Sequence, residues 1–407
     1  MQELNILNEG YNYGKLASTS KNSKIKINNR FFIDLSFSAG SILLGHNNKI
    51  FKKIINELLK KNISNYAFPN IYANKFSKTL KKIFPFYKKF IFCNSGSEAI
   101  MKGIRICRAV SKKKIIVNTS GSWHGSVNET LYTSTVNYKP IKLSDGLPAN
   151  TRNDLKFIPY GDKNKTKKIL DKYKSRICCI LIEPIQGALP TDKNLEYIKF
   201  LSNYANKNKI IIFFDEIITG LRDSKNSFQT RYNFKPTLSV FGKSFAGGLP
   251  IGIIALSSTI YKKINSKKLN IFFGGTFSGN SITTFVANSI TNYLIKNKKI
   301  RIEIEKKTNK FKSELNEFIS ENKLDARVYS YSSMARIVFS KKNILNRSQR
   351  DFFEKNNKAT IMRFSKFMWK NGIYFPRNGI IFFSYSHTKK EINFVKKIVK
   401  KGLLLLK

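Results

Sequence analysis

The sequence has few of the residues that build metal centres and disulfide frameworks. It contains four cysteines and three histidines among 407 residues. Cys93, Cys107, Cys178 and Cys179 show no metal-ligand spacing, and they fall in predicted strands and a predicted helix. We therefore expect four buried free thiols, and neither a metal site nor a disulfide framework.

Long apolar runs are also missing, although 42% of the residues are hydrophobic, which indicates a globular protein. No run approaches the roughly 18 apolar residues that a membrane span requires. The first ten residues lack the basic and then apolar pattern of a signal peptide. These absences predict a cytoplasmic protein with no membrane partner.

Acidic residues are scarce, since 25 Asp and Glu stand against 74 Lys and Arg, and the formal net charge is +49. Such a charge suggests a nucleic-acid partner. The basic residues, however, are mostly Lys and are spread from Lys15 to Lys407, whereas proteins that read bases favour clustered Arg. An excess of Asn and Ile indicates a coding bias instead. We expect non-specific, salt-sensitive attraction to polyanions and no specific nucleic-acid partner.

The stretch from Ile210 to Leu256 contains two short apolar runs that each end in an ionisable residue. The run 210–214 ends at Asp215, and the run 238–241 ends at Gly242 and Lys243. Such runs predict buried strands, and open α/β sheets bind ligands at the carboxyl ends of their strands. We expect Asp215 and Lys243 to share one sheet edge, either as a salt bridge or as parts of a site.

A strand at 89–93 is followed by Asn94-Ser95-Gly96-Ser97 and then a helix. The free N–H groups of a first helical turn favour a phosphate, so this stretch suggests an anion cradle. The alternative is that Ser95 is an ordinary N-cap.

Three further polar stretches follow predicted strands or precede a helix. Trp123 and His124 lie between glycines after a strand at 114–117, where the Trp either stacks on a flat ligand or anchors its loop. Gln186 lies just beyond the strand 178–182, and Thr276 stands in a glycine-rich stretch before a helix that starts near 282. Thr276 is therefore predicted to be either a phosphate contact or a helix cap.

Strands that alternate with helices predict an α/β fold with a mostly parallel central sheet flanked by helices, plus a smaller α+β domain. We expect residues 1–47 to contribute to the small domain, 48–298 to form the large domain and 299–407 to form the C-terminal small domain. No linker rich in Pro, Gly or Ser divides the chain. Other expected elements are a strand at 31–35, helices at 48–61, 72–83 and 302–319, strands near 336–339 and 380–383, and a helix from 389.

Eight stretches, in this order and spacing, resemble the class III aminotransferases of pyridoxal-phosphate fold type I. They are FIDL and LGH within 31–46, FCNSGSEA (92–99), SWHG (122–125), IEPIQG (182–187), FFDEIITGLR (213–222), FGKSFAGGLPIG (241–252), GGTFSGN (274–280) and SYSHT (384–388). Within the class, the chain is most similar to the glutamate-1-semialdehyde aminomutase branch. The resemblance covers nearly the whole chain.

The resemblance implies a role for each candidate residue. Lys243 would form the Schiff base with pyridoxal 5'-phosphate and move a proton during catalysis. Asp215 would pair with the ring nitrogen and keep it protonated. The remaining implied contacts are Ile217 beneath the ring, Trp123 above it with His124 beside it, Gln186 near the phenolic oxygen, and Ser95, Gly96 and Ser97 at the phosphate. Thr276 would reach the phosphate of the other subunit, which implies a homodimer. Glu98, Glu216, Arg222, His46 and His387 match the family too, and we interpret them as structural.

Substrate choice is the point at which the sequence departs from the aminomutase branch. That branch usually has Gly-Ser-Trp where this chain has Phe37-Ser38-Ala39, and residues 1–30 show no counterpart of its substrate-binding Arg. Residues 377–381 also lack its carboxylate. The sequence therefore favours a transaminase that moves an amino group between a small-molecule amino donor and a carbonyl acceptor, with the 2,1-aminomutase as the alternative. A racemase or decarboxylase on the same scaffold, or a cofactor-free binding protein, is also compatible.

Overall fold

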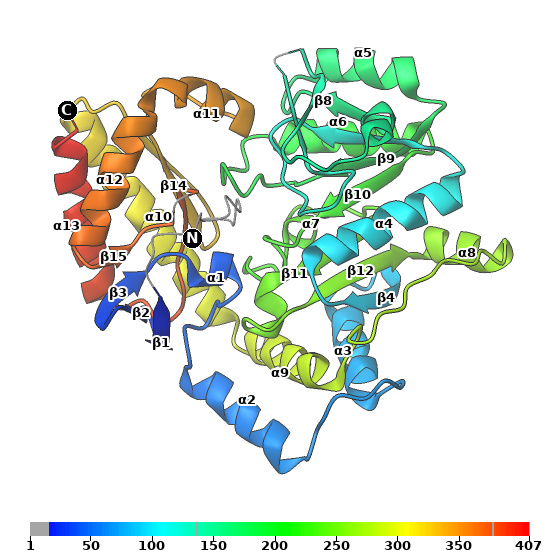
Figure 1. Cartoon of the computed structure of the whole chain (residues 1–407), viewed down its shortest axis with the longest axis horizontal. Helices are drawn as coiled ribbons and strands as arrows, with labels where there is room; N and C mark the ends of the chain where they lie inside the picture. Colours follow the sequence, from blue (N-terminus) through cyan, green and yellow to red (C-terminus); the bar gives the residue numbers. More distant parts are fainter. Residues whose placement is uncertain (1–15, 136, 377, 407) are drawn as a thin grey trace.

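The computed structural model describes residues 16–135, 137–376 and 378–406. Its centre is a seven-stranded sheet with the order β4-β12-β11-β10-β9-β5-β8 (Figure 1). The strands from β11 to β8 are parallel, and β12 runs antiparallel to both of its neighbours. The expected, mostly parallel sheet is therefore confirmed. Its strands are β4 (Tyr87–Cys93), β5 (Ile115–Thr119), β8 (Leu155–Ile158), β9 (Ile177–Ile182), β10 (Ile211–Asp215), β11 (Leu238–Gly242) and β12 (Gly252–Ser257).

Helices cover both faces of this sheet, which explains why its inner strands β9 and β10 are apolar up to their last residues. Successive residues of β10 enter different cores. Ile211 and Phe213 pack in the core that includes Ile100 of α4, whereas Ile212 and Phe214 join the core around Ile198 of α6. The helices of this part are α2 (Lys49–Lys60), α3 (Ile71–Ile83), α4 (Gly96–Ser111), α5 (Lys163–Tyr173), α6 (Leu195–Lys207), α7 (Phe228–Arg231), α8 (Ser258–Ser266) and α9 (Ser281–Lys296).

The N-terminal segment forms a sheet with a strand from near the other end of the chain. The strand β3 (Arg30–Asp34) pairs in parallel with β15 (Ile373–Tyr374), and β1 (Ala17–Lys21) and β2 (Lys24–Ile27) extend this sheet. The sequence did not predict β1 and β2, because β1 is a polar and largely exposed edge strand without an apolar face.

The C-terminal part contains a three-stranded sheet with the order β13-β14-β16 and long helices beside it (Figure 1). Its elements are α10 (Lys298–Glu321), β13 (Arg327–Tyr331), β14 (Met334–Val338), α11 (Arg347–Phe353), α12 (Lys358–Lys370), β16 (Ile380–Phe382) and α13 (Lys389–Leu404). We propose the domain division 1–47, 48–298 and 299–407 given above. The pairing of β3 with β15 supports assigning the N-terminal segment to the small domain.

The predicted state of the cysteines is confirmed, since all four are buried and free. Among the residues that the structure describes, no cluster of three or more His, Cys, Asp and Glu side chains is placed to hold a metal ion. In the same part of the chain, no helix combines the length and the apolar character that crossing a membrane requires.

Phe37 connects the N-terminal segment to the C-terminal part. Its buried ring stacks on His46 with centroids 4.9 Å apart and meets His387 edge-on at 5.0 Å. His46 Nε2 lies 2.7 Å from Asp34 Oδ2, and His387 Nδ1 accepts the Ser384 N–H at 3.1 Å. Burial lowers the pKa of the His387 imidazole to about 4. This side chain is therefore neutral at the centre of the contact.

We expect His387 to make the fold sensitive to acid. Its pKa lies below the ordinary value of 6.5, so the unfolded chain takes up the proton first, and stability falls as the pH drops from 6.5 towards 4. The loss from this group reaches at most about 3 kcal/mol. His387→Asn retains an acceptor for the Ser384 N–H but cannot be protonated. Urea unfolding at pH 7 and pH 4.5 should show a smaller loss in this variant, and equal losses in the two proteins would contradict the assignment.

Candidate active site

A cavity of about 230 Å³ lies where the carboxyl ends of β9, β10 and β11 meet. Asp215 is the last residue of β10, and Lys243 directly follows β11. Both side chains line the cavity, as expected from parallel strands that end at one edge. The complete lining is Gly96, Ser97, Trp123, Gly125, Glu183, Asp215, Ile217, Ile218, Lys243 and Ile251.

Asp215 is held by a buried histidine. His124 Nδ1 lies 2.8 Å from Asp215 Oδ2, and Asp215 Oδ1 accepts the Ile217 N–H at 3.1 Å. Both residues of the pair are buried. His124 Nε2 is also buried, and it has no hydrogen-bond partner among the described residues. When the imidazole is neutral, donation to the carboxylate places its proton on Nδ1 and leaves Nε2 as an acceptor.

Lys243 contacts a segment with an unusual backbone. Its Nζ donates to the Ala39 carbonyl at 3.1 Å. The element α1 (Phe37–Gly40) that contains Ala39 is a left-handed turn, with φ of +46°, +53°, +52° and +82° at its four residues. Each non-glycine residue in this region costs roughly 1–2 kcal/mol, and such strain clusters at functional sites. The segment that the sequence identified as a departure from the aminomutase branch therefore lies against the candidate catalytic amine.

Arg222 holds this turn in place from a fully buried position. Its guanidinium donates to the Gly40 carbonyl, to Ser333 Oγ at 2.9 Å and to the Ile218 carbonyl at 2.7 Å. It also lies over the Phe382 ring, 5.1 Å from the centroid. Burial lowers the pKa of the Arg222 guanidinium to about 9. No carboxylate pairs with it among the described residues, so these carbonyl and hydroxyl groups stabilise the charge.

The start of α4 lies beside Lys243 and supplies free backbone N–H groups. Gly96 and Ser97 line the cavity, and the Ser95 hydroxyl accepts the Glu98 N–H at 3.1 Å, so Ser95 is the N-cap of the helix. Gly96 and Gly252 allow this turn to pack closely against Ile217 and against β12. A Cβ on Gly96 would lie 2.7 Å from Ile217 Cδ1, and one on Gly252 would overlap the Ser95 carbonyl. The arrangement suits an anion such as a phosphate.

Glu183 is a cavity residue that the sequence did not place in the site. It is buried, its Oε2 accepts the Trp123 N–H at 2.8 Å, and its Oε1 accepts the Gly187 N–H at 3.2 Å. Burial raises the pKa of Glu183 to about 7; His124 opposes this shift and the Asp215 carboxylate adds to it. The sequence pattern that identified Asp215 also applies to Glu183, because both are the first polar residue after an apolar strand. Gly125, Ile218 and Ile251 also line the cavity without having been predicted.

Trp123 lines the cavity, but Gln186 and Thr276 do not. The Gln186 amide donates to the Ser120 carbonyl at 2.9 Å and accepts the Arg347 N–H at 2.9 Å. Both ends of this amide therefore have backbone partners, and a contact with a cofactor oxygen stays a prediction.

Thr276 is exposed in a loop that α4 anchors. The buried Lys102 pairs with Glu98 and donates to the Phe273 carbonyl at 2.8 Å and the Gly274 carbonyl at 3.2 Å. The loop is thus fixed to the helix that begins at the cavity, while Thr276 itself faces outward.

Comparison with known proteins gives one consistent family. The model of the family described as "Aminotransferase class-III" matches residues 15–374. The glutamate-1-semialdehyde 2,1-aminomutase of Wigglesworthia glossinidia brevipalpis is 31% identical over 388 residues, covering 93% of this chain and 87% of that protein. The enzyme of the same name from Methanococcus vannielii is 31% identical over 351 residues, covering 85% of this chain and 80% of that protein.

Solved structures share the fold at lower sequence identity. An omega-transaminase from Sphaerobacter thermophilus superposes with a TM-score of 0.88 at 18% identity, covering 97% of this chain and 92% of that one. A glutamate-1-semialdehyde aminomutase from Pseudomonas aeruginosa PAO1 gives a TM-score of 0.86 at 14% identity, covering 97% and 88%. These similarities confirm fold type I. They do not distinguish a transaminase from an aminomutase, because structures of both kinds superpose about equally well.

Gly252→Ala tests the anion cradle. The added methyl group must push β12 away from the Ser95 turn, and overpacking of this kind costs about 1–3 kcal/mol. We expect a lower melting temperature and weaker binding of pyridoxal phosphate, measured by absorbance titration. Pyridoxal without its phosphate serves as the control ligand. If both ligands lose affinity equally, the turn does not hold the phosphate.

Proposed function

This chain belongs to the class III aminotransferases, and from that premise we propose that it acts as a glutamate-1-semialdehyde 2,1-aminomutase. It is a pyridoxal-phosphate-dependent enzyme of this class or a related aminomutase. The observation that carries the narrower proposal is the 31% identity to two enzymes of that name over most of both chains. Such an enzyme moves an amino group from carbon 2 to carbon 1 of one small substrate.

The residues around the cavity fit the cofactor. A helix start with tightly packed glycines, a lysine and a buried carboxylate line one space of about 230 Å³. Pyridoxal phosphate supplies an aldehyde for covalent attachment and a ring that withdraws electrons when its nitrogen is protonated. Lys243 is the amine for that attachment. Ser95, Gly96 and Ser97 would bind the phosphate, and Ile217 and Trp123 would hold the two faces of the ring.

Two residues of the cavity would hold or move protons, Asp215 at the ring nitrogen and Lys243 at the reacting carbon. Asp215 would hold a proton on the ring nitrogen, and His124 fixes the orientation of that carboxylate through Nδ1. Lys243 Nζ would move a proton at the reacting carbon. Glu183 accepts the Trp123 N–H, so it would position the side chain that is proposed to stack on the ring. These assignments extend the predicted roles, with Gln186 left as a candidate for the phenolic oxygen.

We also propose a homodimer in which Thr276 reaches the phosphate of the other subunit. The exposure of Thr276 and the anchoring of its loop by Lys102 support this arrangement, because the residue faces outward from its own cavity.

A second candidate, transamination between two substrates, is favoured by the turn at Phe37–Gly40. Ala39 stands where the aminomutase branch usually carries Trp, and its carbonyl meets the Lys243 amine. The residue that faces the Lys243 amine in this chain therefore differs from the one usual in the aminomutase branch. The sequence also lacks a substrate-binding Arg in residues 1–30 and a carboxylate in residues 377–381. Residues 1–15 and Arg377 of these two stretches lie outside the described residues.

Lys243→Ala tests the catalytic amine. We expect at least a thousandfold loss of turnover, on the order of 4 kcal/mol, because the variant has no amine at this position. Borohydride reduction followed by peptide mass spectrometry should show the cofactor mass on the Lys243 peptide of the wild type. Lys235→Ala, an exposed lysine, is the matched control. Label on another lysine, or near-normal turnover in Lys243→Ala, would contradict the assignment.

The substrate proposal is tested by supplying glutamate 1-semialdehyde alone. An aminomutase needs no other amino donor or acceptor, because the amino group leaves and re-enters the same carbon skeleton to give 5-aminolevulinate. We expect complete conversion that is independent of added amino acids. Turnover that requires a separate donor and acceptor would instead support the transaminase, provided that Lys243 carries the cofactor.

A further inference from the structure

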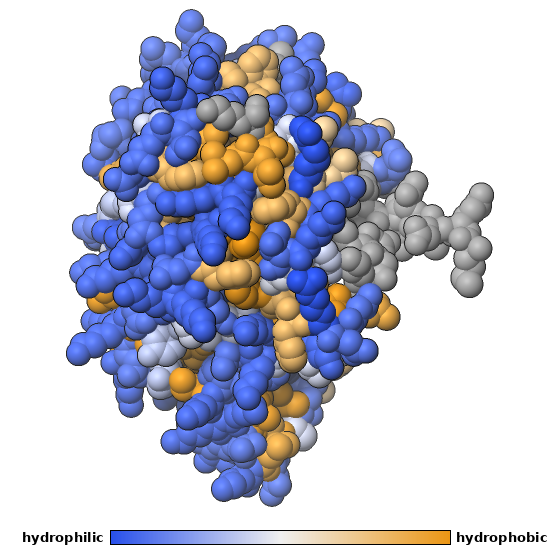
Figure 2. All heavy atoms as spheres, turned by 90° about the vertical axis from the view of Figure 1, so that its left-hand side faces the viewer, coloured by the Kyte–Doolittle hydropathy of each residue, from blue (hydrophilic) through white to orange (hydrophobic). Residues whose placement is uncertain are grey.

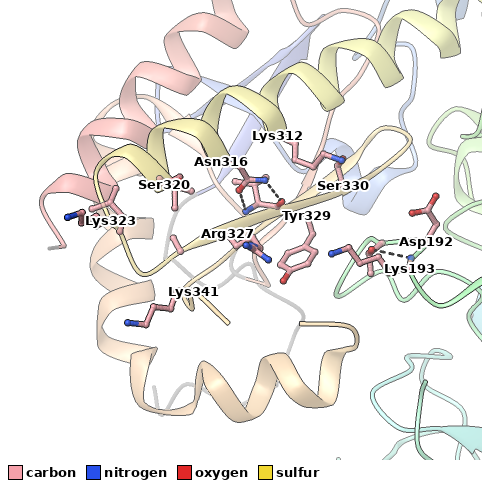
Figure 3. A pocket seen from close by; sticks show the side chains of 15 residues that line it. Asp192, Lys193, Lys312, Asn316, Ser320, Lys323, Arg327, Tyr329, Ser330 and Lys341 are labelled. Carbon is pink, nitrogen blue, oxygen red and sulfur yellow. Dashed lines mark hydrogen bonds between the residues drawn. The ribbon is translucent and has the colours of Figure 1, made fainter. Parts of the chain in front are cut away.

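A second hollow, of about 560 Å³, lies in the C-terminal part between α10, β13 and the loop at 191–193 (Figure 3). It shares no lining residue with the catalytic cavity. Its apolar floor contains Ile319, Leu324 and Val328, and the rim is polar. We call this hollow the α10 groove.

Five cationic side chains line the α10 groove. Lys312 and Lys323 come from α10 and its end, Arg327 from β13, and Lys193 and Lys341 from flanking loops (Figure 3). None of the five has an ion pair within the described part of the chain, although Asp and Glu form pairs with lysines elsewhere, as at Lys396. The single carboxylate of the lining, Asp192, accepts the Tyr232 hydroxyl at 2.7 Å.

Two of these cations converge on one neutral atom. Lys193 Nζ and Arg327 Nη1 both donate to Asn343 Oδ1, at 3.2 and 3.3 Å. Like charges brought this close repel each other, and an amide oxygen neutralises neither. The Asn316 amide, which also lines the groove, is already bonded to the backbone of Val328. An anion in the groove would therefore relieve the repulsion without competing with these bonds.

Lysine alone does not identify a site in this protein. Hydrophilic side chains cover most of the face shown in Figure 2, and the formal charge is +49. The α10 groove differs from that background because its cations surround a hollow of ligand size and include an Arg, whose planar fork matches phosphate.

We propose that the α10 groove is a second binding site, for a small anion that carries several phosphate groups. The spread of cations from Lys323 at one end to Lys193 at the other matches a ligand with more than one charged group (Figure 3). The hollow limits that ligand to the size of a small molecule. The inference does not depend on the identity of the amino-transfer substrate.

The test compares two variants that each remove two positive charges. Lys312→Gln/Arg327→Gln changes the groove, and Lys52→Gln/Lys53→Gln changes exposed positions on α2. Binding of inorganic tripolyphosphate to the cofactor-loaded protein is measured by calorimetry in about 150 mM salt, where diffuse attraction between exposed charges is largely screened. We expect Kd to rise at least about tenfold in the groove variant and less than about twofold in the control. Amino-transfer activity should stay unchanged in both variants, and the groove variant should melt at no lower temperature than the wild type because it loses one of the two repelling cations.

Equal weakening in the two variants would show that tripolyphosphate responds only to net charge, and would overturn the proposal. Absence of binding to the wild type in that salt would do the same. Citrate, a tricarboxylate, is the companion ligand. If it binds as tightly as tripolyphosphate and with the same variant dependence, the assignment to phosphate groups is wrong.

Discussion

The buried guanidinium of Arg222 is the constraint on which the arrangement of the site depends. It follows β10 on the large sheet, and it binds the turn of the N-terminal segment at Gly40 and the C-terminal part at Ser333 and Phe382. A buried charge without a carboxylate partner is stable only while its hydrogen bonds are complete. The three parts of the chain are therefore held in one geometry, and the Ala39 carbonyl meets Lys243 because Gly40 is fixed next to it.

The sheet and its two ionisable edge residues were predictable because their signals are local. A strand buried on both faces must be apolar throughout, so its end is visible as the first charged residue, as at Asp215. The left-handed turn at Phe37–Gly40 has no such signal, since three of its residues are not glycine and tertiary contacts impose the backbone. The partners of Gln186 also come from distant segments, Ser120 and Arg347, and no spacing predicts them. Glu183 had the right signal but was not included in the predicted site.

The residues proposed for the cofactor chemistry and the segment proposed to affect substrate choice belong to different parts of this molecule. Asp215 ends β10, Lys243 directly follows β11 and His124 lies in the loop after β5, and these three residues are the ones proposed to carry the cofactor chemistry. The surface opposite Lys243 is provided by the N-terminal turn, which departs from the aminomutase branch although the chain as a whole matches that branch at 31% identity. The overall sequence identity therefore supports an aminomutase, whereas the contact between Ala39 and Lys243 supports a transaminase.

The loop around Thr276 is held by contacts that depend little on its own side chains. Lys102 holds the loop through the main-chain oxygens of Phe273 and Gly274, which every amino acid possesses. A change of side chain at position 273 leaves these bonds available, whereas replacement of Lys102, which pairs with Glu98, removes their donor. One turn of α4 therefore sets the position of this loop, largely through contacts that do not depend on which side chains the loop carries at positions 273 and 274.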